Sequence, residues 1–255
     1  TLEIDLVVAT VSTVEEASVF NLTKDNELNF IPNESVNINN ENSNEEYKPP
    51  PIDFDLSKSV LTTEQKEIFQ NLLAEHRGVF ATTLKELGKT NVFEHKIEMT
   101  NDTPFQSRPY RTTPTAKKEI DRHVAEMLEH DIIEPSNSPY SSPVVLVRKK
   151  NNAGFRFAID YRRINEFTVP LTFAIPRLED IIDTVASSKA ALFSVVDLSA
   201  GFWQIGLDKE SRPKSAFITH DNLYQFKRMP FGITNASFSF QMAINQILRG
   251  LTWKH

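Results

Sequence analysis

Asp197 is the residue whose position in this sequence best suits metal chemistry. It ends the largely apolar stretch of residues 191–196, and Leu198-Ser199-Ala200-Gly201-Phe202 follows it. A carboxylate at the end of a buried strand, where the backbone turns, can hold a divalent cation over a phosphate group. The same position is also typical of an acid that caps a turn or a helix, so Asp197 alone leaves both roles open.

A second set of candidate residues is cationic and surrounds a turn-rich segment. The set comprises Arg148, Lys149, Lys150 and Arg156, followed closely by Arg162 and Arg163. Strands on both sides of the turn would hold these cations in one cluster, which suits a triphosphate or a nucleic-acid strand. Hairpin tips are also rich in Lys simply because they are solvated, and this alternative stays open.

The third candidate is the segment Arg228-Met229-Pro230-Phe231-Gly232. A proline before an aromatic residue and a glycine marks a rigid bend, at which the backbone can approach a ligand closely. Alone, the pattern indicates only a turn.

The elements that must position these residues alternate between helices and strands. Thr62 and Gln65 have the spacing of a capping box, Pro114 and Pro176 open two further helices, and Asn235 caps the last one. The expected strands are residues 2–8, 93–99, 144–148, 155–160, 191–197, 215–220 and 223–229, of which 144–148 with 155–160 and 215–220 with 223–229 form hairpins. The sequence therefore predicts an α+β fold. In the first of these helices Ile68, Phe69, Leu72 and Leu73 share one face, and in the second Ile120, Val124, Met127 and Leu128 do. In the helix that Pro176 opens, we expect Leu178, Ile181, Ile182 and Val185 to face inward.

Charge and composition divide the chain near residue 60. Residues 1–60 hold twelve Asp and Glu against three Lys and Arg, whereas the remainder holds twenty-two against twenty-five. Residues 21–51 are rich in Asn and Glu and end in three prolines, so we expect a disordered linker there. We predict an acidic, largely disordered connector over 1–60 and a folded domain over 61–255, whose mildly basic balance admits a nucleic-acid partner.

The composition also excludes several kinds of site. The chain has no cysteine, which excludes disulfides, thiolate metal sites and cysteine nucleophiles. Neither a signal peptide nor an apolar run of membrane-spanning length is present, so we expect an intracellular, cytoplasmic protein without a membrane partner.

Taken in order, four segments resemble the reverse transcriptases of gypsy-type long-terminal-repeat retrotransposons, which are relatives of retroviral polymerases. The segments are residues 141–150 (SSPVVLVRKK), 155–165 (FRFAIDYRRIN), 193–198 (FSVVDL) and 229–236 (MPFGITNA). The resemblance covers residues 60–250. It implies an incomplete right-hand polymerase fold, with the fingers and the first half of the palm, behind the acidic connector of a Pol polyprotein.

The resemblance assigns a role to each candidate residue. Asp197 and the backbone carbonyl of Leu198 would bind the two Mg²⁺ ions of the complete enzyme, which stabilise both oxygens of the phosphoryl displacement. Lys149 and Arg156 would contact the triphosphate, as would the backbone amides of Ala200 and Gly201. Phe202 would exclude a 2′-hydroxyl, and Phe231 and Gly232 would line the nucleotide pocket. The remaining cations, Arg148, Lys150, Arg162 and Arg163, would bind nucleic acid.

By the same resemblance, the complete enzyme would copy an RNA or DNA template–primer from deoxynucleoside triphosphates, and its location could include a virus-like particle. Its partners would include the remainder of the polyprotein: the second half of the palm, the RNase H and the integrase. The sequence departs from the family in two places. Ser237-Phe238-Ser239 replaces the usual Pro-Ala-Thr, and no adjacent Asp-Asp pair occurs anywhere. One carboxylate does not hold two Mg²⁺ ions, so we expect this chain alone to be inactive.

Two other readings remain. One is a domesticated or decayed element that keeps the basic fingers as a non-enzymatic, nucleic-acid-binding module. The other is an unrelated α+β interaction protein. Metal-dependent primer extension would favour the enzyme, whereas salt-sensitive binding without extension would favour the module.

Overall fold

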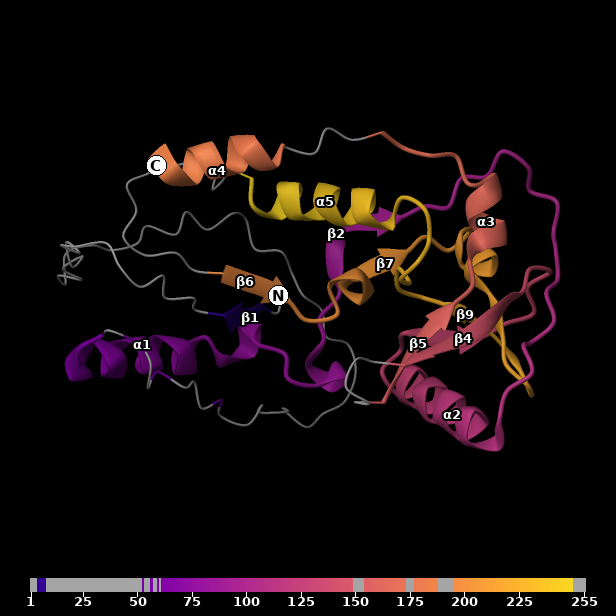
Figure 1. Cartoon of the computed structure of the whole chain (residues 1–255), viewed down its shortest axis with the longest axis horizontal. Helices are drawn as coiled ribbons and strands as arrows, with labels where there is room; N and C mark the ends of the chain where they lie inside the picture. Colours follow the sequence, from indigo (N-terminus) through magenta and orange to yellow (C-terminus); the bar gives the residue numbers. More distant parts are fainter. Residues whose placement is uncertain are drawn as a thin grey trace. The chain divides into compact units, whose positions relative to one another are not determined.

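The computed structural model describes residues 4–7, 52, 56, 59, 61–148, 154–172, 177–187 and 195–249. The predicted linker over 21–51 lies outside these residues, as do Lys149 and Lys150. The chain divides into two compact units, one formed by residues 3–82 and 176–198, the other by residues 83–175 and 199–255. Helices and strands occur in both units (Figure 1), which confirms the predicted α+β class.

In the first unit, two helices and one pair of strands are described. The elements are β1 (Ile4–Val7), α1 (Thr63–Glu75), α4 (Leu178–Ser187) and β6 (Val195–Leu198), and a short 3₁₀ helix (Arg77–Val79) follows α1. β1 pairs antiparallel with β6. The predicted capping box of α1 is present, because the Thr62 hydroxyl accepts from the Gln65 amide and the Gln65 side chain accepts from the Thr62 amide.

The apolar face of α4 differs from the prediction, and that of α1 is only partly buried. In α1, Leu73 is buried but Leu72 is 48% exposed. In α4, Ile181 and Ile182 are 41% and 56% exposed, and no described residue of the helix is buried. The period of 3.6 residues identified both helices correctly, but it does not determine whether another element covers the apolar face.

The second unit contains the larger core. Its helices are α2 (Pro114–Glu129), α3 (Arg162–Phe167) and α5 (Ala236–Ile247), with 3₁₀ helices η2 (Leu84–Glu86), η4 (Gly201–Gln204) and η5 (Arg212–Ser215). Its strands are β2 (Thr90–His95), β3 (Ile133–Pro135), β4 (Ser142–Arg148), β5 (Phe155–Ile159), β7 (Ile205–Leu207), β8 (Phe217–Ile218) and β9 (Leu223–Phe226). Both predicted hairpins are present, as β4–β5 and β8–β9.

Five strands of this unit form one sheet, in the order β3-β9-β8-β4-β5. β4 pairs parallel with β8 and antiparallel with β5, so the hairpin that carries the predicted cations is an extension of this sheet. β2 pairs with β7 as a separate parallel pair. The strand expected over 93–99 is displaced toward the N-terminus, because β2 begins at Thr90 and ends at His95, and Met99 makes an isolated bridge with Thr168.

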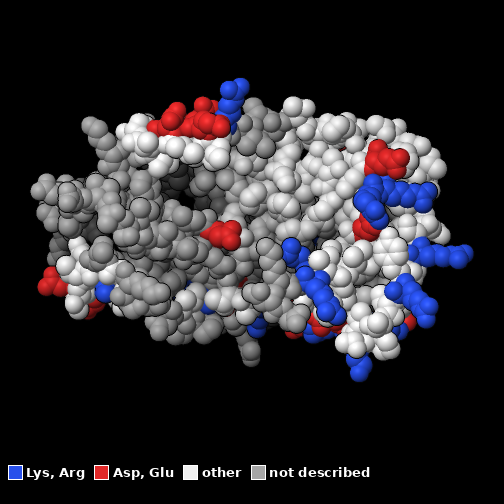
Figure 2. Space-filling view, in the orientation of Figure 1, with Lys and Arg blue, Asp and Glu red and all other residues white. Residues whose placement is uncertain are grey.

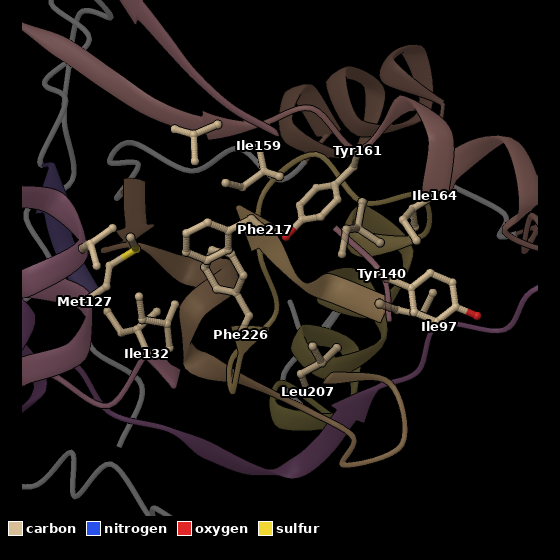
Figure 3. Close-up of a cluster of buried hydrophobic side chains, with 14 of the residues drawn as sticks. Ile97, Met127, Ile132, Tyr140, Ile159, Tyr161, Ile164, Leu207, Phe217 and Phe226 are labelled. Atoms are coloured by element: carbon tan, nitrogen blue, oxygen red, sulfur yellow. The ribbon is translucent and has the colours of Figure 1, made fainter. Parts of the chain in front are cut away.

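The main core fills the space between α2, α3 and the sheet. Figure 3 shows the Tyr161, Phe217 and Phe226 side chains within it, and all three are at most 2% exposed. The Tyr161 hydroxyl is not left unsatisfied, because it donates to the Ser215 carbonyl at 2.8 Å. Met127 of α2 is buried here, whereas Leu128, on the same predicted face, is 37% exposed.

A second, smaller core lies where α5 packs. It contains Ile205, Met229, Ala236 and Ala243, with Phe93, Phe202 and Phe240 partly buried against it. Asn235 occupies the N-cap position of α5, but the predicted cap by its side chain is absent. Its backbone is left-handed, with φ of 69°, and its side-chain amide instead bonds to Val169 and Leu171.

Candidate nucleotide and nucleic-acid interface

Asp197 and Leu198 lie at the end of β6, in the first unit. The Asp197 side chain is exposed and Leu198 is half-buried, and in the antiparallel pairing with β1 the Cα partner of Asp197 is Asp5. No group of three or more His, Asp or Glu side chains that could hold a metal is found among the described residues. Because Mg²⁺ takes six oxygen ligands, the described residues do not make a complete magnesium site.

A tight turn follows Leu198 and leads into η4, in the second unit. Ala200 adopts the left-handed conformation, with φ of 43°, which is uncommon for a residue other than glycine. The Trp203 amide donates to the Ala200 carbonyl at 2.8 Å, and the Gln204 side-chain amide donates to the Ser199 carbonyl at 2.9 Å. These bonds close the loop on itself and fix the position of Phe202.

Phe202 contacts two other aromatic residues, one of which the sequence had also singled out. Its ring centroid lies 5.1 Å from that of Phe231 and 5.4 Å from that of Phe240. The Trp203 ring centroid also lies 5.7 Å from that of Phe231. Phe231 is 49% exposed and Phe202 is half-buried, so the pair offers an apolar surface that is open to a ligand.

The turn that carries Phe231 is held at both ends. On one side the Met229 amide donates to the Ile205 carbonyl at 2.8 Å. On the other, the Asn165 side chain donates to the Gly232 carbonyl and accepts from the Thr234 amide, both at 2.8 Å. Gly232 has φ of 86°, a conformation that most residues with a side chain rarely adopt, and this explains the glycine in the bend.

The predicted cationic cluster divides into two sets at opposite ends of the β4–β5 hairpin. Arg156 pairs with Val147 near the tip, and the Arg148 guanidinium lies 5.9 Å from the centre of the Phe155 ring. Arg162 and Arg163 begin α3, beyond the other end of β5, where Val144 pairs with Ile159. Figure 2 shows Lys and Arg side chains over the part of the unit formed by α2, α3 and this hairpin.

Arg162 and Arg163 line an open pocket of about 570 Å³. The other lining residues are Gln106, Ser107, Arg108, Tyr110, Pro143, Asp160 and Glu166. The segment 106–108 reaches this position because it pairs with the start of β4, where the Ser107 amide donates to the Ser141 carbonyl at 3.1 Å. With three arginines against two acids, the pocket suits a phosphate-bearing ligand.

The arginines of this pocket are held in different ways. Arg162 donates to both oxygens of Asp160, at 2.8 and 2.6 Å, and the Tyr110 hydroxyl donates to the same carboxylate at 2.8 Å. The hydrogen bond from Arg162 has the largest effect and that from Tyr110 adds to it, and together they hold the pKa of Asp160 well below its usual range. The Arg163 guanidinium lies 4.4 Å from the centre of the Phe105 ring, a cation–π contact.

Arg108 and Tyr110 were not predicted from the sequence. They lie in an irregular segment with no periodicity, far along the chain from Arg162. Only the pairing of residues 106 and 107 with Ser141 brings them to the pocket, and no pattern within the segment indicates that pairing.

Among the described residues, no helix is both long enough and apolar enough to cross a membrane.

Comparison with known proteins identifies one matching family and several similar polyproteins. Residues 147–255 match the family described as reverse transcriptase (RNA-dependent DNA polymerase). The chain is 39% identical over 197 residues to the retrovirus-related Pol polyprotein from transposon 297 of Drosophila melanogaster, a match that covers 75% of this chain and 18% of that protein. It is 32% identical over 206 residues to the Pol polyprotein from transposon gypsy of the same species, covering 78% of this chain and 20% of that protein.

The fold of this chain is also similar to that of solved reverse transcriptases. The prototype foamy virus protease–reverse transcriptase is 25% identical, with a TM-score of 0.63, and the match covers 77% of this chain and 26% of that one. A foamy viral protease–reverse transcriptase solved with an RNA/DNA hybrid superposes with a TM-score of 0.65 at 21% identity, over 81% of this chain and 29% of that one. The fold is therefore part of a polymerase fold, as predicted. The chain spans about a fifth of the length of the curated relatives it matches, and it belongs to the reverse transcriptases of gypsy-type long-terminal-repeat retrotransposons.

Proposed function

We propose that this chain is a segment of an RNA-directed DNA polymerase that binds the incoming deoxynucleoside triphosphate and the template–primer. The observation that carries the proposal is the contact between Phe202 and Phe231. The resemblance assigns both residues to the nucleotide pocket from separate motifs, and their rings lie 5.1 Å apart on one open surface. A sugar or base would be held there by stacking and by apolar contact.

The pocket formed by Arg108, Arg162 and Arg163 supports the nucleic-acid half of the proposal. Guanidinium groups bind phosphate oxygens through paired hydrogen bonds, and they do so without reading the bases. Arg163 is already oriented by the Phe105 ring, and Arg162 by Asp160. Less side-chain entropy is therefore lost when a backbone phosphate binds.

Asp197 and the Leu198 carbonyl are the groups of this chain that we propose to bind Mg²⁺. When bound, Mg²⁺ would stabilise the attacking and leaving oxygens of nucleotidyl transfer. Completion of that site, together with RNase H and integrase activities, is proposed for the longer Pol polyprotein. The proposed location, in the cytoplasm or in a virus-like particle, follows from that assignment. The alternative of a non-enzymatic nucleic-acid-binding module shares the arginine pocket but needs neither Asp197 nor the aromatic pair.

Binding of a short RNA/DNA template–primer to the chain, measured by fluorescence anisotropy at several salt concentrations, tests the proposal. The double variant Arg108→Ala with Arg163→Ala should bind more weakly, and the slope of log K against log salt should fall by up to about 2. The loss should be similar for unrelated sequences, because phosphate contacts carry no base readout.

Arg122→Ala is the matched control, because it removes an arginine that is ion-paired with Glu119 and Glu126 on α2 and does not line the pocket. We expect the control to bind like the parent. A double variant that also binds like the parent at every salt concentration would show that the pocket is only a solvated surface. The tip of the hairpin is tested in the same way by Lys149→Ala with Arg156→Ala.

A further inference from the structure

Arg228 links the two segments that carry the aromatic pair. Its Nη1 atom donates to the Trp203 carbonyl at 3.1 Å and to the Gly88 carbonyl at 2.6 Å. The side chain is half-buried. A charged donor shared between two backbone carbonyls is a strong contact.

The carbonyl of Trp203 is one that η4 cannot satisfy within itself. The last carbonyls of any helix have no donor one turn farther on, and an arginine side chain can supply one. Arg228 therefore acts on the end of η4, one residue after Phe202.

The backbone of Arg228 is fixed as well. Arg228 bridges Gly206 of β7, and the next amide, that of Met229, donates to the Ile205 carbonyl at 2.8 Å. Met229 and Pro230 are fully buried, and Phe231 follows as the first exposed residue of the turn. One residue thus holds the end of the Phe202 loop by its side chain and begins the Phe231 turn by its backbone.

We propose that Arg228 is a positioning residue that sets the separation of Phe202 and Phe231, and through it the preference for deoxyribonucleotides over ribonucleotides. The second part rests on the proposed function, because it assumes that the pair holds the sugar of the incoming nucleotide. The first part is independent of that function.

Two measurements on the whole chain test the two parts separately. The chain has two tryptophans, so Trp253→Phe leaves Trp203 as the only tryptophan, and its ring lies 5.7 Å from that of Phe231. In this background Arg228→Met should shift the Trp203 emission to longer wavelength and raise its quenching by acrylamide.

The second measurement is the ratio of the affinities for dATP and ATP, taken with Mg²⁺. In Arg228→Met this ratio should fall by about tenfold, because the contacts of a charged donor with two carbonyls are lost.

Arg212→Met is the matched control. Arg212 is also half-buried and also donates to a backbone carbonyl of β7, that of Leu207 at 3.3 Å. Its ion-pair partner, at 3.5 Å, is Glu134 of β3 and not a residue of the segments that carry Phe202 and Phe231. This control should leave both readings unchanged, and Arg228→Lys, which keeps a charged donor, should recover most of the nucleotide preference. If Arg228→Met fails to fold by circular dichroism, Arg228→Gln takes its place, with a smaller change expected in the same direction.

The outcomes distinguish the two parts of the proposal. Unchanged Trp203 emission in folded Arg228→Met, or an equal change in Arg212→Met, would overturn the positioning role. A changed emission with an unchanged dATP-to-ATP ratio would overturn the role in selection. If the parent chain bound neither nucleotide, the proposed nucleotide site itself would be wrong, while the Trp203 emission would still decide the positioning role.

Discussion

The side-chain amide of Asn165 donates to the carbonyl oxygen of Gly232 at 2.8 Å and accepts from the backbone amide of Thr234, two residues farther along the chain. Asn165 belongs to α3, the helix that begins with Arg162 and Arg163, and Gly232 directly follows Phe231. The arginines of the pocket and the exposed ring of Phe231 are therefore connected through one short helix.

Replacing Asn165 by Ala should lower the free energy of unfolding by about 1–3 kcal/mol, because two backbone groups of the turn lose their partner. Urea unfolding followed by circular dichroism measures this. Asn245→Ala is the control, since the Asn245 side chain only accepts from Gln241 on the exposed face of α5. The control should change stability by less than about 0.5 kcal/mol, and an equally small effect of Asn165→Ala would refute the structural role of the clamp.

His95 should make the protein less stable in mild acid. It is 1% exposed, its Nδ1 lies 2.7 Å from the Ser239 hydroxyl, and its Nε2 has no partner among the described residues. Burial lowers its pKa from 6.5 to about 4. The unfolded chain therefore takes up a proton first as the pH falls. The stability from a neutral His95 is complete above pH 6.5 and is lost progressively down to about pH 4, to a total of about 3 kcal/mol.

Urea unfolding between pH 7.5 and 4.5 checks this expectation. His95→Leu should flatten the pH dependence in that window, because leucine carries no titrating group. His220→Leu, which removes an exposed histidine bonded to Thr112, should keep the dependence of the parent. The prediction does not survive if His95→Leu retains the full slope.

Phe231→Ala should weaken nucleotide binding with little loss of stability. The ring is 49% exposed, so its removal opens no cavity, whereas base or sugar stacking on an aromatic ring contributes about 1–3 kcal/mol to binding. Isothermal titration with dATP and Mg²⁺ measures the affinity. Leu248→Ala, at 43% exposure a comparable apolar truncation on the segment after α5, is the control and should bind like the parent. Equal affinities for all three proteins would exclude Phe231 from the nucleotide site.

Local patterns predicted helices α1, α2, α4 and α5 and both hairpins, because capping and periodicity act within a few residues, but they did not predict the short elements α3, β3 and β7. Thr62 and Gln65 form the expected capping box, and the β4–β5 hairpin has the expected strands. The burial of α4 was predicted wrongly, since its apolar face depends on what another element covers rather than on the helix itself. The cap predicted for Asn235 was wrong, because its side chain bonds to Val169 and Leu171 and not to the first amides of α5.

The residues of the candidate site were likewise predicted only in part. The resemblance singled out Phe202 and Phe231, and the structure brings them together. It could not reveal Arg108 or Tyr110, which reach the pocket only through long-range strand pairing. The sequence also did not show that Arg162 lies away from the hairpin tip. Arg162 follows β5, whose five residues span about 16 Å, so residues at the two ends of this strand are far apart although they are close in sequence.

By itself, the chain should extend no primer. It has no adjacent Asp pair, and the described residues supply no complete magnesium site. Incubation with a poly-adenylate template, an oligo-thymidylate primer, dTTP and Mg²⁺ or Mn²⁺ should give no signal above the blank. Sustained synthesis by the pure chain would mean that its carboxylates suffice.

The role of Asp197 in polymerase chemistry is tested most directly by restoring the remainder of the enzyme. The chain is joined to the following part of the polymerase region from the transposon 297 relative, and extension is compared between Asp197 and Asp197→Asn. We predict extension by the parent, and none by Asp197→Asn although it binds the template–primer with unchanged affinity. Extension that survives Asp197→Asn would contradict the metal role of this residue. A joined protein that binds the template–primer but never extends it would contradict the polymerase assignment and favour the binding module.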